Sequence, residues 1–180
     1  RVDGLFGTES VVATTGTVAF PVRDALGVTR QIVGQAAVFS AGTGEDKIGM
    51  FVRTQDPTDE TRSFLRYVGY IPTMVGGVQV VPDRPHTITL SPDERFLYAI
   101  GDTSVSQFAI GVTFSGLPTL THVATYSGAL NDIFGATGAT SPLLAGGDDL
   151  HRSVNFDKEL HRPTAVHISP DGTRLYLTDA

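Results

Sequence analysis

The chain has 180 residues, 41% of them hydrophobic, and a net charge of -6 from 19 acidic and 13 basic residues. That size suits one domain with a substantial core, and no apolar run approaches the roughly 18 residues of a membrane-spanning helix. The acidic charge disfavours nucleic acid as a partner, and the absence of cysteine excludes disulfides and thiolate chemistry within these residues.

Short runs rich in Val, Ile, Thr, Phe and Tyr alternate with Gly- and Pro-containing turns, which predicts an all-β chain. A first unit, residues 16–71, has predicted strands at Thr17–Val22, Thr29–Ala41, Lys47–Thr54 and Arg62–Ile71. A second unit, residues 84–128, has predicted strands at His86–Leu90, Phe96–Ile100, Ser104–Ile110 and Leu120–Ser127. A third, residues 163–180, holds two strands and follows a long loop, residues 129–162. Four strands in about 40 to 45 residues are typical of one propeller blade.

An internal repeat supports these units, because Arg84–Tyr98 and Arg162–Tyr176 follow the same sequence pattern. Each contains Arg-Pro, Ser-Pro-Asp and Leu-Tyr in the same order. Proline presets φ near -65° in the Ser-Pro-Asp turn, where serine and aspartate can bond local N–H groups. Glu94 stands where the third unit has Gly172, in a position that favours glycine by about 1 kcal/mol. We therefore expect Glu94→Gly to stabilise the chain.

The first unit matches the others less closely. Phe39 takes the place of Tyr98 and Tyr176, and Phe51 takes that of Phe108. Phe64, Tyr67 and Tyr70 lie in its fourth strand. Regular alternation predicts that Phe64 and Tyr70 share one face and that Tyr67 lies on the other, with packing between units favoured over contact with a partner.

The Ser-Pro-Asp turns at Ser91–Tyr98 and Ser169–Tyr176 resemble the blade signature of YVTN/lactonase-like β-propellers. The preceding Arg-Pro pairs and the pattern Val105-x-Gln107-Phe108 are similar to the same family. The resemblance implies a β-propeller segment of four-stranded antiparallel blades. About three blades form an incomplete ring, since propellers close with 4 to 8. We expect further sequence, another chain or self-association to complete it, and the start at Arg1 favours a piece of a larger protein.

The predicted function is that of a non-catalytic binding or scaffold module in a larger secreted or cell-envelope protein. Loops between blades, above all 129–161, would contact a protein partner or neighbouring subunits. The expected location is the periplasm, the cell surface or the medium, and no cofactor is predicted. The alternative from the resemblance is a lactonase-like hydrolase with its site at the mouth of the central channel.

That alternative has four candidate catalytic residues near the first strands of units, which line the channel in propellers: Arg84, His86, Arg162 and His167. A structural role is favoured for the two arginines, because they recur at one repeat position. His167 alternates with apolar strand residues, which also favours a structural role. A chain that hydrolyses no lactone, and an Arg84→Ala variant that loses its fold rather than an activity, would contradict the enzyme alternative.

A metal site is the other alternative, in the long loop. Its candidate ligands are Asp148, Asp149, His151, Asp157, Glu159 and His161. Carboxylate oxygens suit Ca²⁺, and two histidines with a carboxylate suit Zn²⁺. The spacing fits no compact metal motif, so a solvated polar loop is the favoured interpretation.

Overall fold

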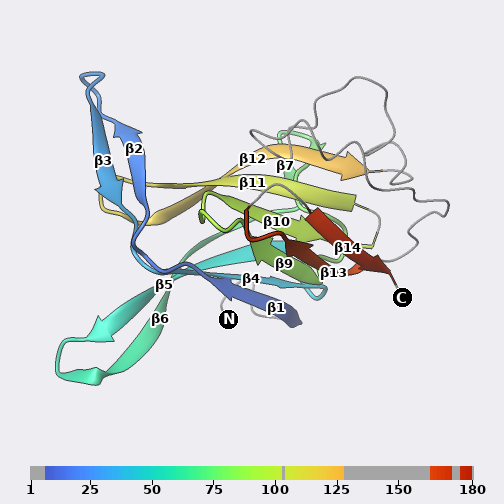
Figure 1. The fold of residues 1–180 in the computed structure, drawn as a ribbon, viewed down its shortest axis with the longest axis horizontal. Coiled ribbons are helices and arrows are strands. Elements are labelled where there is room, and N and C mark those ends of the chain that lie inside the picture. The colour runs from blue at the N-terminus through green and yellow to red at the C-terminus, as the bar shows by residue number, and fades with distance from the viewer. Residues whose placement is uncertain (1–6, 103, 128–162, 172–174, 180) are drawn as a thin grey trace.

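The computed structural model describes residues 7–102, 104–127, 163–171 and 175–179. Within these ranges every regular element is a β-strand, and all strand pairs are antiparallel. The prediction of an all-β chain is thus confirmed. Two four-stranded sheets form the body, and the β2–β3 hairpin and the far end of β5–β6 project from it (Figure 1).

The first sheet has the strand order β1-β4-β5-β6. Its members are β1 (Thr8–Ala13), β4 (Ala37–Gly42), β5 (Lys47–Asp56) and β6 (Asp59–Ile71). Two small hairpins lie outside it, β2 (Ala19–Arg23) with β3 (Thr29–Val33), and β7 (Met74–Val75) with β8 (Val78–Gln79).

The second sheet has the strand order β12-β11-β10-β9 and is the simple meander that the sequence predicted. Its members are β9 (Thr87–Leu90), β10 (Phe96–Ile100), β11 (Ser104–Val112) and β12 (Pro118–Ser127). The last pair, β13 (Pro163–Ile168) with β14 (Leu175–Asp179), begins a third unit, and β13 contacts β9 and β10.

The prediction for the start of the first unit is wrong in two respects. The predicted strand Thr29–Ala41 is two strands, because the chain leaves its extended course between Val33 and Ala37. The predicted first strand, observed as β2, pairs only with β3, and β1 takes its place in the sheet. The Asp24 turn encodes its hairpin locally, but whether that hairpin joins the sheet depends on tertiary contacts.

The two sheets are equivalent in register. Phe39 pairs with Met50 where Tyr98 pairs with Gln107. Each outer pair has an irregularity at the same place, between Met50 and Phe51 in one sheet and between Gln107 and Phe108 in the other. The proposed match of Phe51 with Phe108 is therefore confirmed, and the repeat extends to a β-bulge that the sequence did not reveal.

The bulge changes which aromatic residues of β6 lie on the same face of the sheet. Phe51 pairs with Tyr67 and Gly49 pairs with Tyr70, while Thr54 pairs with Phe64. Directly paired residues point to one face, and Phe51 and Gly49 lie on the same face of β5. Tyr67 and Tyr70 therefore share a face, and Phe64 lies on the other. The expectation from regular alternation was wrong because one extra residue shifts the period.

Both sheets have a glycine at the same place, Gly42 at the end of β4 and Gly101 directly after β10. A Cβ atom at Gly42 would lie 2.0 Å from the carbonyl oxygen of Gly7, and one at Gly101 would lie 2.1 Å from that of Asp83. Both glycines follow the same register position, directly after Ala41 and Ile100. In each sheet the backbone that precedes the neighbouring strand, at Gly7 or at Asp83, therefore passes so close to the glycine that no side chain fits there.

The main core lies between the sheets. One face of the first sheet buries Phe39, Ile48 and Met50 against the face of the second sheet that carries Leu97 and Phe108. The opposite face of the second sheet packs against the third unit through a smaller cluster: Ile100, Val105 and Val166, with Ile168 at its margin. The second sheet is thus covered on both faces, as expected of an inner layer.

Candidate functional site

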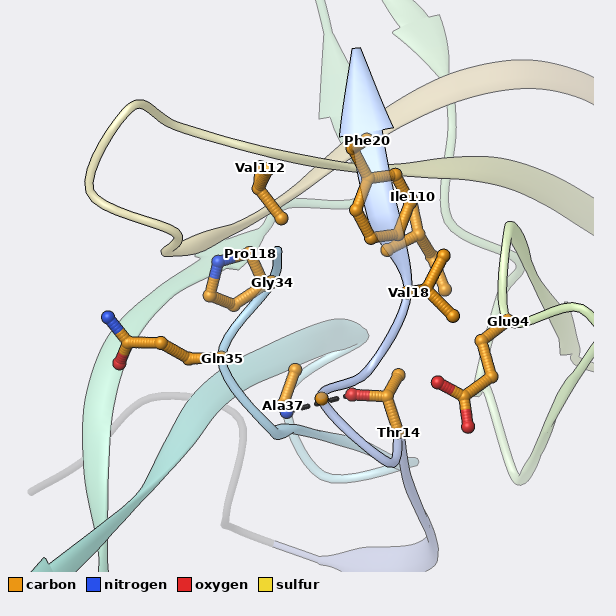
Figure 2. A pocket seen from close by; sticks show the side chains of 11 residues that line it. Thr14, Val18, Phe20, Gly34, Gln35, Ala37, Glu94, Ile110, Val112 and Pro118 are labelled. Atoms are coloured by element: carbon orange, nitrogen blue, oxygen red, sulfur yellow. Dashed lines mark hydrogen bonds between the residues drawn. The ribbon is translucent and has the colours of Figure 1, made fainter. Parts of the chain in front are cut away.

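A pocket opens where the base of the β2–β3 hairpin meets the second sheet (Figure 2). It contains about 260 Å³ of empty space, including the part open to solvent. The part that a water-sized sphere can enter is only about 10 Å³, which is room for about one water molecule and far below the roughly 300 to 1,000 Å³ of ligand pockets. Its lining residues are Thr14, Gly16, Val18, Phe20, Gly34, Gln35, Ala37, Glu94, Ile110, Val112 and Pro118.

The walls of the pocket are mainly apolar. Phe20 from β2 and Ile110 from β11 are buried members of the main core, and Val112 packs at its margin. Gly34 brings the hairpin backbone close, since a Cβ there would lie 3.1 Å from Val112 Cγ1. In Figure 2 the polar side chains of Gln35 and Glu94 stand on opposite sides of this apolar surface.

Glu94 occupies the turn between β9 and β10 with φ of 55°, as the repeat predicted for this position. Its amide donates to the carbonyl of Ser91, which closes the turn. The Ser91 hydroxyl accepts from the amides of Arg95 and Phe96, at 3.2 and 2.9 Å. The predicted Ser-Pro-Asp turn chemistry is thus confirmed.

The Glu94 carboxylate reaches back to the loop after β1. It accepts from the Thr15 amide at 2.9 and 3.1 Å and from the Thr15 hydroxyl at 3.0 Å. Among the described residues it takes part in no ion pair. The half-buried Glu94 carboxylate therefore lies at the pocket, and the amide and hydroxyl of Thr15 are its hydrogen-bond partners among the described residues.

Three hydrogen bonds and one cation–π contact attach the hairpin base to the second sheet. Gln35 donates its amide to the carbonyl of Gly116 at 2.9 Å and its side chain to that of Ser115 at 3.0 Å. Arg95 donates to the carbonyl of Ala19 at 3.3 Å, with its guanidinium 5.6 Å from the ring centre of Phe20. The pocket is therefore framed on both sides by contacts between the units.

Hydrogen bonds also hold the turn at the tip of the β2–β3 hairpin. One Asp24 carboxylate oxygen accepts from the amides of Leu26 and Val28, at 2.9 and 2.8 Å. The Asp24 carbonyl accepts from Gly27, and the Arg23 guanidinium donates to the Gly27 carbonyl. Leu26 stands on this fixed turn with 90% of its surface exposed.

The candidate catalytic residues are only partly described. Arg84 is exposed with φ of 50°, and its guanidinium pairs with Asp102 at 3.2 Å. His86 contacts the hydroxyl of the adjacent Thr87 at 3.1 Å, and no hydrogen bond or ion pair joins it to Arg84. His167 is exposed on β13, opposite Tyr176 in register. Arg162 lies outside the described residues.

The candidate metal ligands, Asp148 to His161, all lie outside the described residues. In the described part of the chain no three His, Asp or Glu residues are grouped so that they could hold a metal ion. No helix in the same ranges is long and apolar enough to cross a membrane.

Sequence reasoning missed most of the pocket. It placed Glu94 correctly in its turn, and the departure from Gly172 was the one available signal. The partner Thr15 has no sequence signal, because it lies in a loop of a different unit. Phe20 and Gln35 were hidden by the wrong assignment of the hairpin to the first sheet.

No family model matches this chain, and no curated protein matches it. A solved structure, that of a functionally unknown protein from Desulfotomaculum acetoxidans DSM 771, is similar with 19% sequence identity and a TM-score of 0.39. The match covers 68% of this chain and 43% of that one, so this chain spans less than half of that protein.

Proposed function

We propose that the chain is a β-propeller segment that serves as a non-catalytic protein-binding module, with the β2–β3 hairpin as its contact element. The repeated register of the two sheets, including the bulge, supports the propeller assignment. The proposal includes completion of the ring by further units and a location in the periplasm, at the cell surface or in the medium.

The observation that carries the binding role is the exposure of Leu26 on a hydrogen-bonded turn. An isolated exposed apolar side chain is ordinary, but here five hydrogen bonds that involve Asp24 or Arg23 hold the turn. A turn that is ordered before binding loses little conformational entropy when it is bound. Val28, directly after the turn, and Val33, at the base of the same hairpin, are also more than half exposed.

The partner would be a protein with an apolar depression that accepts the hairpin tip. A photo-crosslinking residue placed at Leu26 in the full chain tests this in the producing cells. The control is the same residue at Val78, which is 59% exposed on the small β7–β8 hairpin. We expect one defined protein adduct from position 26, and loss of that adduct when Val28→Asp is added. Equal adducts from both positions would contradict the proposal.

The lactonase-like alternative can be tested with one variant. The ion pair of Arg84 is 59% exposed on the arginine side, so its loss costs well under 1 kcal/mol. We therefore expect Arg84→Ala to stay folded. This expectation differs from that of the sequence analysis, in which a structural role of Arg84 implied that the variant would lose its fold. Lactone hydrolysis by the full chain that disappears in Arg84→Ala would overturn the non-catalytic proposal.

A further inference from the structure

We propose that the face of the first sheet that is turned away from the second sheet binds a second copy of the chain, which presents its β13–β14 pair. The contact is head-to-tail, and two such contacts join two copies into a closed ring. This inference rests on the repeated register of the sheets, as does the propeller part of the proposed function, and it is independent of the hairpin tip.

The first surface, called the first-sheet outer face, runs across all four strands of that sheet. Directly paired residues point to one face. Two paired rows form this face: Val11, Ser40, Gly49 and Tyr70 in one, and Ala13, Val38, Phe51 and Tyr67 in the other. Val11 is 57% exposed, and Tyr67 and Tyr70 are 36% and 39% exposed. An apolar and aromatic strip therefore lies open here, and tyrosine is enriched at protein interfaces.

The second sheet indicates what covers a face of this kind. In register, Ile88 corresponds to Val11, and Leu97 corresponds to Val38. Ile88 and Leu97 are only 3% and 0% exposed, because they lie in the core with Phe39 of the first sheet. The first-sheet outer face is thus equivalent to a face that, in the second sheet, is buried against the neighbouring sheet.

The covering surface is repeated as well. Phe39 in the first sheet corresponds to Tyr98 in the second and to Tyr176 in the third unit. Phe39 and Tyr98 are 0% and 3% exposed, and each lies on the face of its sheet that packs against the next unit. Tyr176 is 52% exposed, and the exposed His167 is opposite it in register. These two residues mark the third-unit outer face, so the chain exposes both sides of one repeated contact.

Two copies are the number that closes a ring. A contact between unlike surfaces adds copies until the rotation closes. Two copies of three units fall within the about 4 to 8 blades of closed propellers, whereas three copies exceed them. We therefore expect a dimer with two identical contacts, in which the third-unit outer face of each copy packs on the first-sheet outer face of the other.

The experiment is sedimentation equilibrium of the full chain at about 10 µM, where a dimer with a Kd of about 1 µM is mostly formed. We expect twice the 19.1 kDa of one chain. The mass of one chain would overturn the inference without contradicting the proposed propeller, which other units would then complete. A mass that keeps rising with concentration would overturn the closed dimer.

Two variants locate the contact, each at a side chain that is more than half exposed in one copy. Val11→Arg on the first-sheet outer face and Tyr176→Asp on the third-unit outer face should each raise the Kd of the dimer at least about ten-fold. Val78→Arg is the matched control, because Val78 is 59% exposed on the β7–β8 hairpin, outside both faces. The control should leave the Kd unchanged, and an equal rise in all three variants would overturn the inference.

An equimolar mixture of Val11→Arg and Tyr176→Asp tests the head-to-tail geometry. In a mixed dimer one contact keeps both parent surfaces, and the other joins the new arginine to the new aspartate, whose charges attract. We therefore expect the mixture to dimerise more tightly than either variant alone. No gain on mixing, or a rise in Kd for Val11→Arg without one for Tyr176→Asp, would overturn the head-to-tail contact.

Discussion

The Glu94 carboxylate accepts hydrogen bonds from the amide and the hydroxyl of Thr15, and so joins the β9–β10 turn of the second sheet to the loop after β1. The same residue has a left-handed backbone conformation, with φ of 55°. One residue thus combines a destabilising backbone with a stabilising contact between units. The two effects can be separated by substitution.

We expect Glu94→Ala to lower the free energy of unfolding by about 1 to 2 kcal/mol, because alanine loses the bonds to Thr15 and keeps the strain. Glu94→Gly also loses the bonds but relieves the strain, so it should remain within about 0.5 kcal/mol of the parent chain. This revises the gain in stability that the sequence predicted. Urea denaturation at pH 7 measures both, and equal stabilities of the two variants would contradict the left-handed turn.

The sequence predicts the second sheet closely because its signals are local. The Ser91-Pro92-Asp93 turn contains its own hydrogen-bond partners, and Phe96–Ile100 is observed as predicted. The first sheet was predicted less well, since β1 is paired with β4 across the inserted hairpin. Nothing in residues near β1 specifies that distant pairing. The pocket was missed for the same reason, because Thr15 and Glu94 meet only through tertiary structure.

The paired glycines give a second prediction. Gly101→Ala and Gly42→Ala should each destabilise the chain by about 3 kcal/mol, because the new methyl group would overlap the backbone carbonyl of Asp83 or of Gly7, respectively. Gly69→Ala in β6 is the control, in the sheet that also contains Gly42. A Cβ at Gly69 would meet only the flexible end of Met50 at 3.6 Å, so its effect should stay within about 0.5 kcal/mol. Similar losses of stability in all three variants would indicate that the backbone does not approach Gly42 and Gly101 closely.

A third prediction follows from the rings beside the repeated bulge. Phe51 and Tyr67 have ring centres 5.5 Å apart, and the equivalent Phe108 and His122 are 5.7 Å apart. A double-mutant cycle with Phe51→Leu and Tyr67→Leu should give a coupling energy of about 0.5 to 1.5 kcal/mol. Phe64 lies on the opposite face of the sheet, so Phe51→Leu and Phe64→Leu should be additive within about 0.5 kcal/mol. Coupling to Phe64 instead of Tyr67 would contradict the bulge.

The last prediction concerns acid and the β5–β6 turn. The Thr58 hydroxyl, which donates to Asp56 at 2.6 Å, and the Thr58 amide hold the pKa of Asp56 below its ordinary value of 3.8. Thr61 lowers the pKa of Asp59 in the same way. A carboxyl with a lowered pKa stabilises the folded form above its unfolded pKa and loses that contribution as the pH falls through its folded pKa.

The turn should therefore keep its hydrogen bonds at pH 5 and lose them only as the pH falls below 3.8. Carboxyl ¹³C titration of the full chain measures both groups. Thr58→Ala should raise the pKa of Asp56 toward its ordinary value and leave Asp59 nearly unchanged, and Thr61→Ala should do the reverse. Each variant serves as the control for the other, because the hydroxyls of Thr58 and Thr61 donate to different carboxylates, those of Asp56 and Asp59. Titration of Asp56 at or above 3.8 in the parent chain would show that Thr58 does not bond the carboxylate in solution.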